Sequence, residues 1–561
     1  MSFKVCVGKS DFATLRGKNG YYIDKTELIY ELVEGAGNEV TLFTRPRRFG
    51  KTLTMSMFEN FFNIRKDSRD IFEGLDIMKH TDFCGKWMNQ RPVLSISLKD
   101  AEADSFEVAY ERLKNLIAEL CVKLTDLVDS PSVDAMSVQV FDRLMTKTAS
   151  GADMRDSLKT IMRLLYSVYG KKVILLIDEY DVPLARANEN NTAENNFYKR
   201  MLDVIRGIMS KSLKDNEFLE FAVVTGCLRI SKESIFTGTN NFAAYSVLDE
   251  RFSRYFGFSE EEVERMLEAA DRKENAAKIR EWYDGYVFGS SHVYCPWDVI
   301  NYISDLSDNR KVRPKCYWKN SSHNGILLSF VKRPEFKVKG KFEILMNGGT
   351  ITRTVSDSLT YDTLNATEDN LWSVLLMTGY VTKASPDEDG ETVAIRIPNR
   401  EVATIFQDTV ARLFLDTVDR QTQNDLMDAL WKGDGDAAGG AISDLLWKTI
   451  SYNDYHEDYY HAFLAGVFTG IGYEVESNKE RGLGRPDILL KDTDNRRALI
   501  IEAKKSTSQA DMEGDCRTAL SQIAEMKYAD GLLDYGFTQV RCYGVAFYRK
   551  QALVKGQESK S

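Results

Sequence analysis

The chain has 561 residues, more than one hydrophobic core usually supports, so we expect three or four domains. It is 43% hydrophobic and 28% charged with a net charge of -10, which excludes a nucleic-acid surface over the whole molecule and leaves only a local basic patch. Its eight cysteines lack C-x-x-C spacing and no apolar run suits a signal peptide or membrane span, so we expect no zinc site, no disulfide framework, no membrane contact and a cytoplasmic location.

An aromatic stretch precedes the first predicted strand. Residues 27–34 form an amphipathic run that we predict to be a short helix, capped by Thr26. Tyr22 and Asp24 have two interpretations. They pack and cap, or they border a nucleotide base or ribose, as residues before a phosphate loop can do.

A phosphate loop is predicted where a short apolar run, residues 40–44, enters a turn and a helical pattern leaves it. The turn ends in Gly50-Lys51-Thr52, as in the sequence G-x-x-x-x-G-K-[ST], although Arg45 stands where that pattern has its first glycine. We expect backbone amides near Gly50 and the Lys51 ammonium to hold phosphates, and Thr52 to reach Mg2+. The predicted nucleotide-binding residues of this loop are Arg45, Pro46, Arg47, Arg48, Phe49, Gly50, Lys51 and Thr52. Its three arginines contact either phosphate or another domain.

Strands and helices alternate after the loop, which predicts a doubly wound α/β sheet. We expect a strand over residues 92–98, helices over 104–128 and 153–169, and a strand over 173–177. The last strand delivers Asp178 and Glu179 at its carboxyl end. In a nucleotide-hydrolysing site, Asp178 would hold Mg2+ through its water shell and Glu179 would polarise the attacking water. The alternative is a buried strand that ends in solvated carboxylates.

A further strand is predicted over residues 219–224, with Thr225 at its end. A polar residue in this place serves as γ-phosphate sensor in NTPases that carry an acidic pair, so Thr225 is a candidate for that role. Arg229 and Lys232 could complete a charge clamp, or each could make an ordinary surface ion pair. An arginine finger from a neighbouring subunit would require a homo-oligomer, whereas Arg229 could act within its own chain.

These segments together resemble the bacterial AAA-ATPase-like family. The resemblance rests on YYIDKTELI, TRPRRFGKT, LLIDEYD and TGCLRISKESIF, and it continues through residues 282–286, 294–297 and 317–320. The family's loop commonly reads RPRRFGKT, so Arg45 departs from the general pattern and not from the family. Cys295 replaces an asparagine that is usual in the family. The resemblance implies an ATPase with a P-loop NTPase parallel sheet, flanking helices, and ATP and Mg2+ as ligands.

The pattern changes near residue 257. Ser259 and Glu262 form a capping box at the start of an amphipathic helix. Two β-like stretches, residues 380–383 and 392–397, flank a turn-rich segment, and we interpret the region as a mostly helical lid and adaptor with a small winged element. The glycine-rich residues 433–440 predict a linker or loop.

A second acidic constellation lies near the carboxyl end. Asp487 follows Pro486 before one predicted strand, and Glu502 and Lys504 end another, on the same face because they are two residues apart. Glu502 follows three aliphatic residues, and an ionised carboxylate at the end of a buried strand is costly without a cation. The alternative is an exposed strand on which Glu and Lys merely alternate.

This constellation matches the PD-(D/E)xK pattern and resembles the nuclease-superfamily domain often fused to this ATPase family. Residues 482–487, the Glu502 strand and a helix with Gln522 carry the resemblance. It implies an α/β restriction-endonuclease-like fold in which two carboxylates hold Mg2+ and Lys504 contacts the attacking water or the scissile phosphate. The predicted catalytic residues are Glu179, Glu457, Asp487, Glu502, Lys504 and Gln522, and the predicted metal ligands are Thr52, Asp178, Asp487 and Glu502.

We therefore expect an ATPase domain over residues 1–256, a lid and adaptor over 257–415 and a nuclease-like domain over 416–561. The predicted function is ATP hydrolysis coupled to Mg2+-dependent cleavage of nucleic acid, with DNA as the expected substrate. In a second hypothesis, ATP drives a regulatory switch whose nuclease-like domain binds nucleic acid or protein without cleaving. A third is a metabolic phosphotransferase, which would leave the carboxy-terminal site unexplained.

Overall fold

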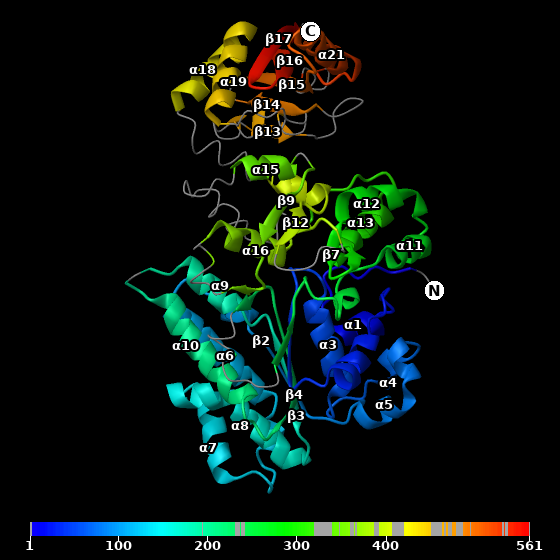
Figure 1. Cartoon of the computed structure of the whole chain (residues 1–561), viewed down its shortest axis with the longest axis vertical. Helices are drawn as coiled ribbons and strands as arrows, with labels where there is room; N and C mark the ends of the chain where they lie inside the picture. The colour runs from blue at the N-terminus through cyan, green and yellow to red at the C-terminus, as the bar shows by residue number, and fades with distance from the viewer. Residues whose placement is uncertain are drawn as a thin grey trace. The chain divides into compact units, whose positions relative to one another are not determined.

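Five apolar segments pair as a parallel sheet in the order β2-β3-β4-β1-β6 (Figure 1). The strands are β1 Val40–Thr44, β2 Val93–Ser97, β3 Val173–Asp178, β4 Leu219–Gly226 and β6 Phe242–Tyr245. Every residue of β1 and β3 is buried, as expected for strands covered on both faces. Because β4 lies between β1 and β3, the phosphate loop, the acidic pair and Thr225 meet at the carboxyl ends of neighbouring strands.

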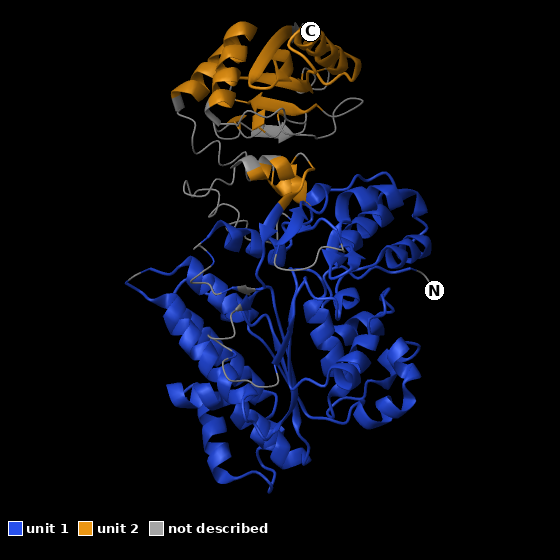
Figure 2. Cartoon of the chain, viewed as in Figure 1, with its two compact units in different colours: residues 1–322, 352–401 blue, residues 323–351, 402–561 orange. Residues whose placement is uncertain are grey.

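This computed structural model divides into two compact units, residues 1–322 with 352–401 and residues 323–351 with 402–561 (Figure 2). The residues described are 3–192, 194–230, 236, 242–318, 339–346, 348–359, 364, 367–385, 392–406, 420–449, 460, 463–464, 467–468, 474–477, 486–493, 495–529, 532 and 537–559. Within these residues, no helix combines the length and the apolar character needed to cross a membrane. The three domain boundaries expected from the sequence stay predictions.

Helices cover both faces of the parallel sheet (Figure 1). On one face lie α1 Phe12–Gly17, α3 Lys51–Phe62, α4 Arg69–Phe72 and α5 Thr81–Trp87, and on the other lie α6 Phe106–Val122, α7 Ala135–Met145, α8 Gly151–Tyr169, α9 Val182–Glu189 and α10 Phe197–Leu213. The helices expected over residues 104–128 and 153–169 are confirmed as α6 and α8. In α3, Met57, Phe58 and Phe61 are buried, as the helical spacing predicts.

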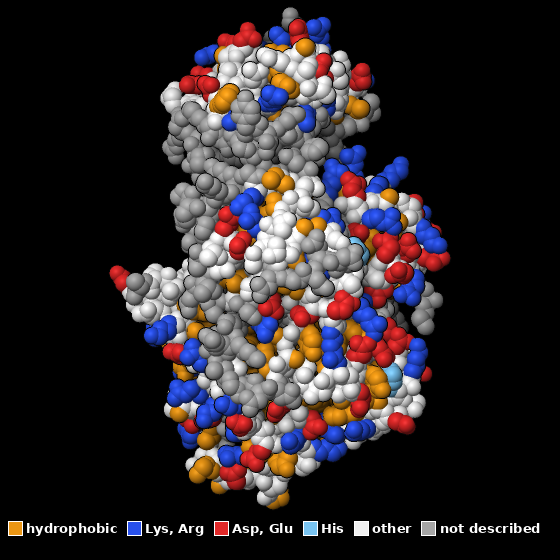
Figure 3. Space-filling model, in the orientation of Figure 1, with side chains coloured by type: hydrophobic (Ala, Val, Ile, Leu, Met, Phe, Trp, Pro, Cys, Tyr) orange, Lys and Arg blue, Asp and Glu red, His pale blue; other side chains and the backbone are white. Residues whose placement is uncertain are grey.

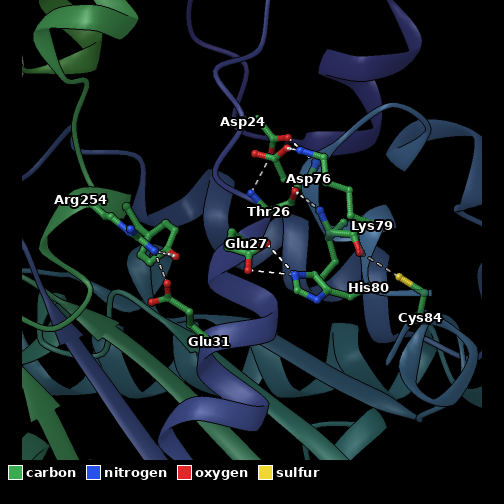
Figure 4. A network of polar contacts seen from close by, with 11 residues as sticks. Asp24, Thr26, Glu27, Glu31, Asp76, Lys79, His80, Cys84 and Arg254 are labelled. Carbon is green, nitrogen blue, oxygen red and sulfur yellow. Dashed lines mark hydrogen bonds and ion pairs between the residues drawn. The ribbon is translucent and has the colours of Figure 1, made fainter. Parts of the chain in front are cut away.

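The segment before β1 is held by a polar network (Figure 4). The Asp24 carboxylate accepts hydrogen bonds from the backbone amides of Thr26 (2.8 Å) and Asp76 (2.7 Å) and from the Thr26 hydroxyl (2.7 Å). Thr26 stands at the N-cap of α2 (Glu27–Tyr30), but its side chain makes no capping hydrogen bond, so the predicted cap is wrong. The Thr26 hydroxyl instead bonds Asp24 and accepts from the amide of Ile77. Of the two interpretations of Asp24, these hydrogen bonds favour the structural one, in which it packs and does not border a nucleotide.

The rest of the first unit combines helices with small sheets. Its elements are α11 Glu260–Ala269, α12 Ala276–Tyr283, β7 Tyr286–Phe288, β8 Ser291–Val293, α13 Pro296–Asp308, α16 Glu368–Thr378, β11 Thr382–Lys383 and β12 Thr392–Arg396. The capping box at Ser259 and Glu262 is present. The two predicted β-like stretches pair antiparallel as β11 and β12, and β9 Ile351–Thr354 adds a third strand, which is consistent with a small winged element.

The second unit is built on a mixed sheet with the order β13-β14-β15-β16-β17. Its elements are α15 Lys339–Met346, α18 Arg420–Lys432, α19 Gly435–Thr449, β13 Glu474–Ser477, β14 Ile488–Asp492, β15 Arg497–Lys505, α21 Met512–Glu525, β16 Gln539–Tyr548 and β17 Gln551–Ser559. Only β15 and β16 pair in parallel. One face packs on α18 and α19 through Leu490, Leu499 and Ile501, and the other packs on α21 through Leu489 and Ile500.

The prediction of a linker at residues 433–440 is wrong, because α19 begins at Gly435. The glycines have a packing reason instead. A Cβ on Gly435 would lie 2.6 Å from the carbonyl oxygen of Val554, and one on Gly439 would lie 3.0 Å from that of Ala552. Glycine lets α19 approach the backbone of β17, and this close contact outweighs the low helix propensity of the segment.

Candidate nucleotide and nuclease sites

The turn after β1 encloses the Lys51 side chain. Gly50 has φ +86°, which glycine adopts without strain, and its carbonyl accepts the amide of Thr54 to start α3. Lys51 is only 6% exposed, and its ammonium donates to the carbonyl oxygens of Arg45 and Pro46, both at 2.9 Å. Phosphate oxygens that reach this ammonium would replace the two carbonyls as its partners.

Arg45 is fully buried, and its guanidinium points into the core. Nη1 donates to the carbonyl oxygens of Thr44 (2.9 Å) and Tyr245 (2.8 Å), and the group lies 5.0 Å from the ring centroid of Phe256 and 5.7 Å from that of Phe288. Burial lowers the pKa of Arg45 to about 10. Of the two roles left open by the sequence, these contacts favour the structural one, in which Arg45 anchors the start of the loop.

The other two arginines of the loop diverge. The Arg48 guanidinium lies 4.2 Å from the ring centroid of Trp297 and donates to the carbonyl oxygen of Tyr317 (2.8 Å), so it contacts the region after the sheet. Burial opposes the charge of Arg47, but the nearby Cys227 and Asp181 outweigh it and raise the pKa of the Arg47 guanidinium. The nucleotide-binding role of Arg47 stays a prediction.

Pro46 and Phe49 are covered by the same region. A Cβ on Gly379, which ends α16 with φ +86°, would lie 3.0 Å from the Cβ of Pro46. The ring centroid of Phe49 lies 5.0 Å from that of Tyr286 and 4.9 Å from that of Phe288. The first unit therefore packs its β7 hairpin and the end of α16 directly on the phosphate loop.

The acidic pair meets the predicted sensor at the carboxyl ends of β3 and β4. The Thr225 hydroxyl donates to Asp178, and both side chains are buried. Glu179 has φ +53°, a conformation that costs energy outside glycine and is concentrated at functional sites. Burial raises the pKa of Glu179, and repulsion by Asp178 adds to the shift while Lys51 opposes it. Lys51, Asp178, Glu179 and Thr225 are thus brought to one place.

Thr52 and Arg229 have no side-chain contact described with Lys51, Asp178, Glu179 or Thr225. Thr52 lies exposed in the first turn of α3. Arg229 forms an ion pair of 2.7 Å with Asp357, and its strand β5 (Arg229–Ile230) pairs with β10 (Ser358–Leu359). Their metal and nucleotide roles stay predictions, and Lys232 lies outside the described residues.

An apolar cavity of about 110 Å³ lies beside the loop. Its lining includes Gly50, Leu53 and Thr54 from the loop and α3, together with Tyr22 and Ile300. The Tyr22 hydroxyl is 3.5 Å from the sulfur of Met57. Tyr22 therefore borders a hollow next to the predicted phosphate site, as the second of its two interpretations requires.

In the second unit, strand pairing joins the two predicted metal ligands. Ile488 of β14 stands opposite Ile501 of β15, which places Asp487 beside Glu502. The backbone amide of Asp487 donates to Glu502 Oε2 (3.3 Å), and Asp487 Oδ2 accepts from the amide of Ala503 (2.8 Å). Each carboxylate is thus hydrogen-bonded to the other's strand, and Glu502 is only 2% exposed.

Two further predicted residues join this pair. The Gln522 amide, from α21, donates to Glu502 Oε1, and the Lys504 ammonium lies 3.8 Å from the same oxygen. Glu457 lies outside the described residues. In the described part of the chain no third His, Cys, Asp or Glu completes a metal-binding group. Two carboxylates nevertheless fit Mg2+, which is commonly held by one or two carboxylates plus water and substrate phosphate.

Comparison with known proteins agrees with the two regions that carry these sites. Residues 6–236 match the family described as "Predicted AAA-ATPase", and residues 455–557 match the PD-(D/E)XK nuclease superfamily. The chain joins an AAA-ATPase-like region to a nuclease-superfamily region. It is also similar to an "Uncharacterized protein in vnfD 5'region" of Azotobacter chroococcum mcd 1, with 25% identity over 579 residues that cover 99% of this chain and 98% of that protein. The resemblance inferred from the motifs is therefore confirmed.

The AAA-ATPase-like region also contains a contact that the sequence does not reveal. Asp181 stands at the N-cap of α9 without capping it, and its Oδ2 accepts from the amides of Cys227 (2.8 Å) and Leu228 (2.9 Å). A Cβ on Gly226 would lie 2.6 Å from the ring of Tyr180. Asp181 therefore fastens the chain after β4 to the acidic pair, and the only sequence signal is an unexplained second aspartate after Asp178.

A buried carboxyl pair lies in the first unit, in the part of the sequence between the two matched regions. Asp298 and Glu401 are each 1% exposed and hydrogen-bond to each other, and Glu401 Oε1 accepts from the amide of Trp318 (2.7 Å). Burial and the neighbouring Asp298 raise the pKa of Glu401, while the Arg48 charge opposes the shift at Asp298. One proton is thus retained on the pair near the phosphate loop.

Glu401→Gln is expected to flatten the pH dependence of stability above neutrality. A raised pKa means that the folded protein holds a proton that the unfolded chain releases above its ordinary value of about 4.3. The contribution of this proton to the free energy of unfolding is therefore complete at pH values below the unfolded pKa. It is lost as the pH rises from there through the folded pKa, by at most about 1.4 kcal/mol per pH unit. Urea unfolding between pH 6 and 9 measures the slope, with the exposed Glu264→Gln as control. Equal slopes in wild type and Glu401→Gln would contradict the retained proton.

Proposed function

We propose that the AAA-ATPase-like region binds and hydrolyses ATP and that the nuclease-superfamily region cleaves DNA with Mg2+, in the bacterial cytoplasm. The observation that carries the proposal is the pair of Asp487 and the buried Glu502, each hydrogen-bonded to the other's strand, with Gln522 and Lys504 beside Glu502. A structural strand end would not require a second carboxylate, a lysine and a glutamine around one buried carboxylate.

At the nucleotide site, the Lys51 ammonium and the amides around Gly50 would hold the phosphates. Arg47 would add a charge contact, and Asp178 and Thr52 would orient Mg2+. Glu179, with its raised pKa, would accept a proton from the attacking water. The hydrogen bond from Thr225 to Asp178 keeps the sensor beside the acidic pair, where it can respond to the γ-phosphate.

The cavity beside Tyr22 supports a nucleotide with its base in an apolar environment. Its apolar lining and its contact with Gly50 suit a planar ring joined to phosphates at the loop. A base in this cavity would lie against Leu53 and Tyr22.

At the nuclease site, Mg2+ bound by Asp487 and Glu502 would lower the pKa of a bound water and neutralise charge on the scissile phosphate. Gln522 holds the Glu502 carboxylate in place through its amide. Lys504 points its ammonium to the same carboxylate and would move to a phosphate oxygen when substrate is present. Asp487 is kept beside Ala503 by a backbone hydrogen bond, so the ligand pair is positioned before any substrate arrives.

Charge restricts where nucleic acid can approach. Acidic side chains gather over α11 on the face seen in Figure 3, and Glu260, Glu261 and Glu262 line a groove there together with Asp24. A polyanion is repelled from such a surface. We therefore place the nucleic acid on the second unit.

The decisive experiment is a cleavage assay on single-stranded and duplex DNA with Mg2+, with and without ATP. Cleavage that depends on Mg2+ and changes with ATP supports the proposal. No cleavage by the wild type under any of these conditions would overturn it and favour the non-cleaving switch. That alternative draws support from Arg229, because its ion pair with Asp357 links β5, which follows β4, to the residue before β10. An arginine finger would come either from a neighbouring subunit of a homo-oligomer or from Arg229 of the same chain, and light scattering in ATP and in ADP tests for the homo-oligomer.

A further inference from the structure

Trp447, near the end of α19, has an unusually open position. Its side chain is 57% exposed, whereas the other six of the seven tryptophans are buried or half-buried. Leaving an indole in water forfeits one of the largest burial energies available to a side chain. The helix that carries it is firmly placed, because the Ser443 hydroxyl accepts the amide of Ala552 in β17 (2.9 Å).

Two basic residues follow β16, and one of them lies near the Trp447 ring. The Lys550 ammonium lies 4.7 Å from the centroid of Trp447, and the Arg549 guanidinium lies 5.2 Å from the ring centroid of Tyr548. Arg549 and Lys550 form the turn between β16 and β17. The Tyr460 hydroxyl donates to the carbonyl oxygen of Arg549 (2.8 Å), which fixes the turn from below. The Lys550 ammonium thus lies near the exposed ring of Trp447, and Arg549 precedes it in the same turn.

The turn lies at the same edge of the sheet as the nuclease site. β15 and β16 run in parallel, so Lys505 stands opposite Phe547, and the amide of Ser506 donates to the carbonyl oxygen of Phe547 (2.8 Å). The chain then continues directly into Arg549. Glu502 lies on the face of the sheet that α21 covers, and α19 with Trp447 covers the opposite face, so a strand bound at both would pass round the end of β15 and β16.

We propose that Trp447, Arg549 and Lys550 form a platform for a single-stranded segment of the nucleic-acid substrate. One base would stack on the open face of Trp447, and the two cations would contact flanking phosphates. An unpaired strand fits best because its bases offer free faces, whereas duplex bases are stacked on one another. The inference rests on the proposed function, since it names the form of the substrate that reaches Asp487 and Glu502.

The test is binding of fluorescein-labelled oligothymidine to the full chain in EDTA, which prevents cleavage. Trp447→Ala is expected to weaken binding roughly tenfold, since stacking on one aromatic ring contributes about 1–3 kcal/mol per base. Trp447→Phe should retain most of the affinity, because it keeps an aromatic face, but lose the quenching of indole fluorescence on binding. Lys550→Ala should reduce the slope of log affinity against log salt by roughly 0.7.

Lys432→Ala provides the matched control, because Lys432 is an exposed lysine of the same unit, on α18. It should change neither affinity nor salt slope. Tight binding by the wild type that Trp447→Ala leaves unchanged would overturn the platform and spare the nuclease proposal. Absence of any binding by the wild type would overturn the platform, and the cleavage assay on single-stranded and duplex DNA decides the nuclease proposal separately. If the protein binds duplex DNA as tightly as single-stranded DNA, and Trp447→Ala weakens both affinities equally, the assignment to an unpaired strand is overturned.

Discussion

Glu502→Gln is expected to lower Mg2+-dependent cleavage by more than roughly a hundredfold. Loss of groups that merely support a metal ligand costs about 10–100-fold in affinity or activity, and Glu502 is placed as a ligand itself. Glutamine keeps the size of the side chain, and its one carbonyl oxygen can accept the hydrogen bond from Gln522 or the one from the Asp487 amide. The substitution therefore removes the negative charge and leaves the packing of this 2% exposed side chain nearly unchanged.

Two readouts separate metal binding from folding. Calorimetric titration of the full chain with Mn2+ should lose the response in Glu502→Gln, and the exposed Glu513→Gln on α21 should keep it. Urea unfolding in EDTA should show that the free energy of unfolding of Glu502→Gln is close to that of the wild type, because the substitution removes a costly buried charge together with one of its hydrogen bonds. Wild-type cleavage in the Glu502→Gln protein would show that Asp487 and Glu502 do not form the catalytic centre.

Lys51→Ala is expected to weaken ATP binding on the order of a hundredfold. Its ammonium is buried and donates to two carbonyl oxygens, so it is already oriented toward the inside of the loop. Truncating one partner of a buried charge pair costs about 2–5 kcal/mol. Fluorescent ATP-analogue binding measures the loss, with the exposed Lys273→Ala as control, and unchanged affinity would refute the phosphate loop.

Glu179→Gln distinguishes binding from hydrolysis at the same site. It should bind ATP as the wild type does and hydrolyse it roughly a hundredfold more slowly, because a positioned general base contributes about 10²–10⁴ in rate. Its left-handed backbone is kept by either side chain. A Glu179→Gln protein that loses ATP affinity as severely as Lys51→Ala would indicate a structural role for Glu179 instead.

The two candidate sites could be predicted because their reactive residues lie within short sequence segments. Gly50-Lys51-Thr52, Asp178-Glu179 and the Glu502 strand each place reactive side chains at the end of an apolar strand, and such local patterns set both the element and the position of its last residue. The expected helix before β1 was only partly correct. Thr26 has the residue type of a cap, but the network through Asp24 and Ile77 takes up its hydroxyl.

The sequence by itself determined the parallel sheet, the phosphate loop, the acidic pair and the nuclease strands, because periodicity and motif spacing act over a few residues. The tertiary structure decided what depends on distant partners. It placed Arg45 between Phe256 and Phe288, paired Arg229 with Asp357 and Asp298 with Glu401, and turned a glycine-rich segment into a helix against β17. The energy of a buried charge or of a close backbone contact depends on residues that are distant in the sequence, and a local sequence pattern does not specify those residues.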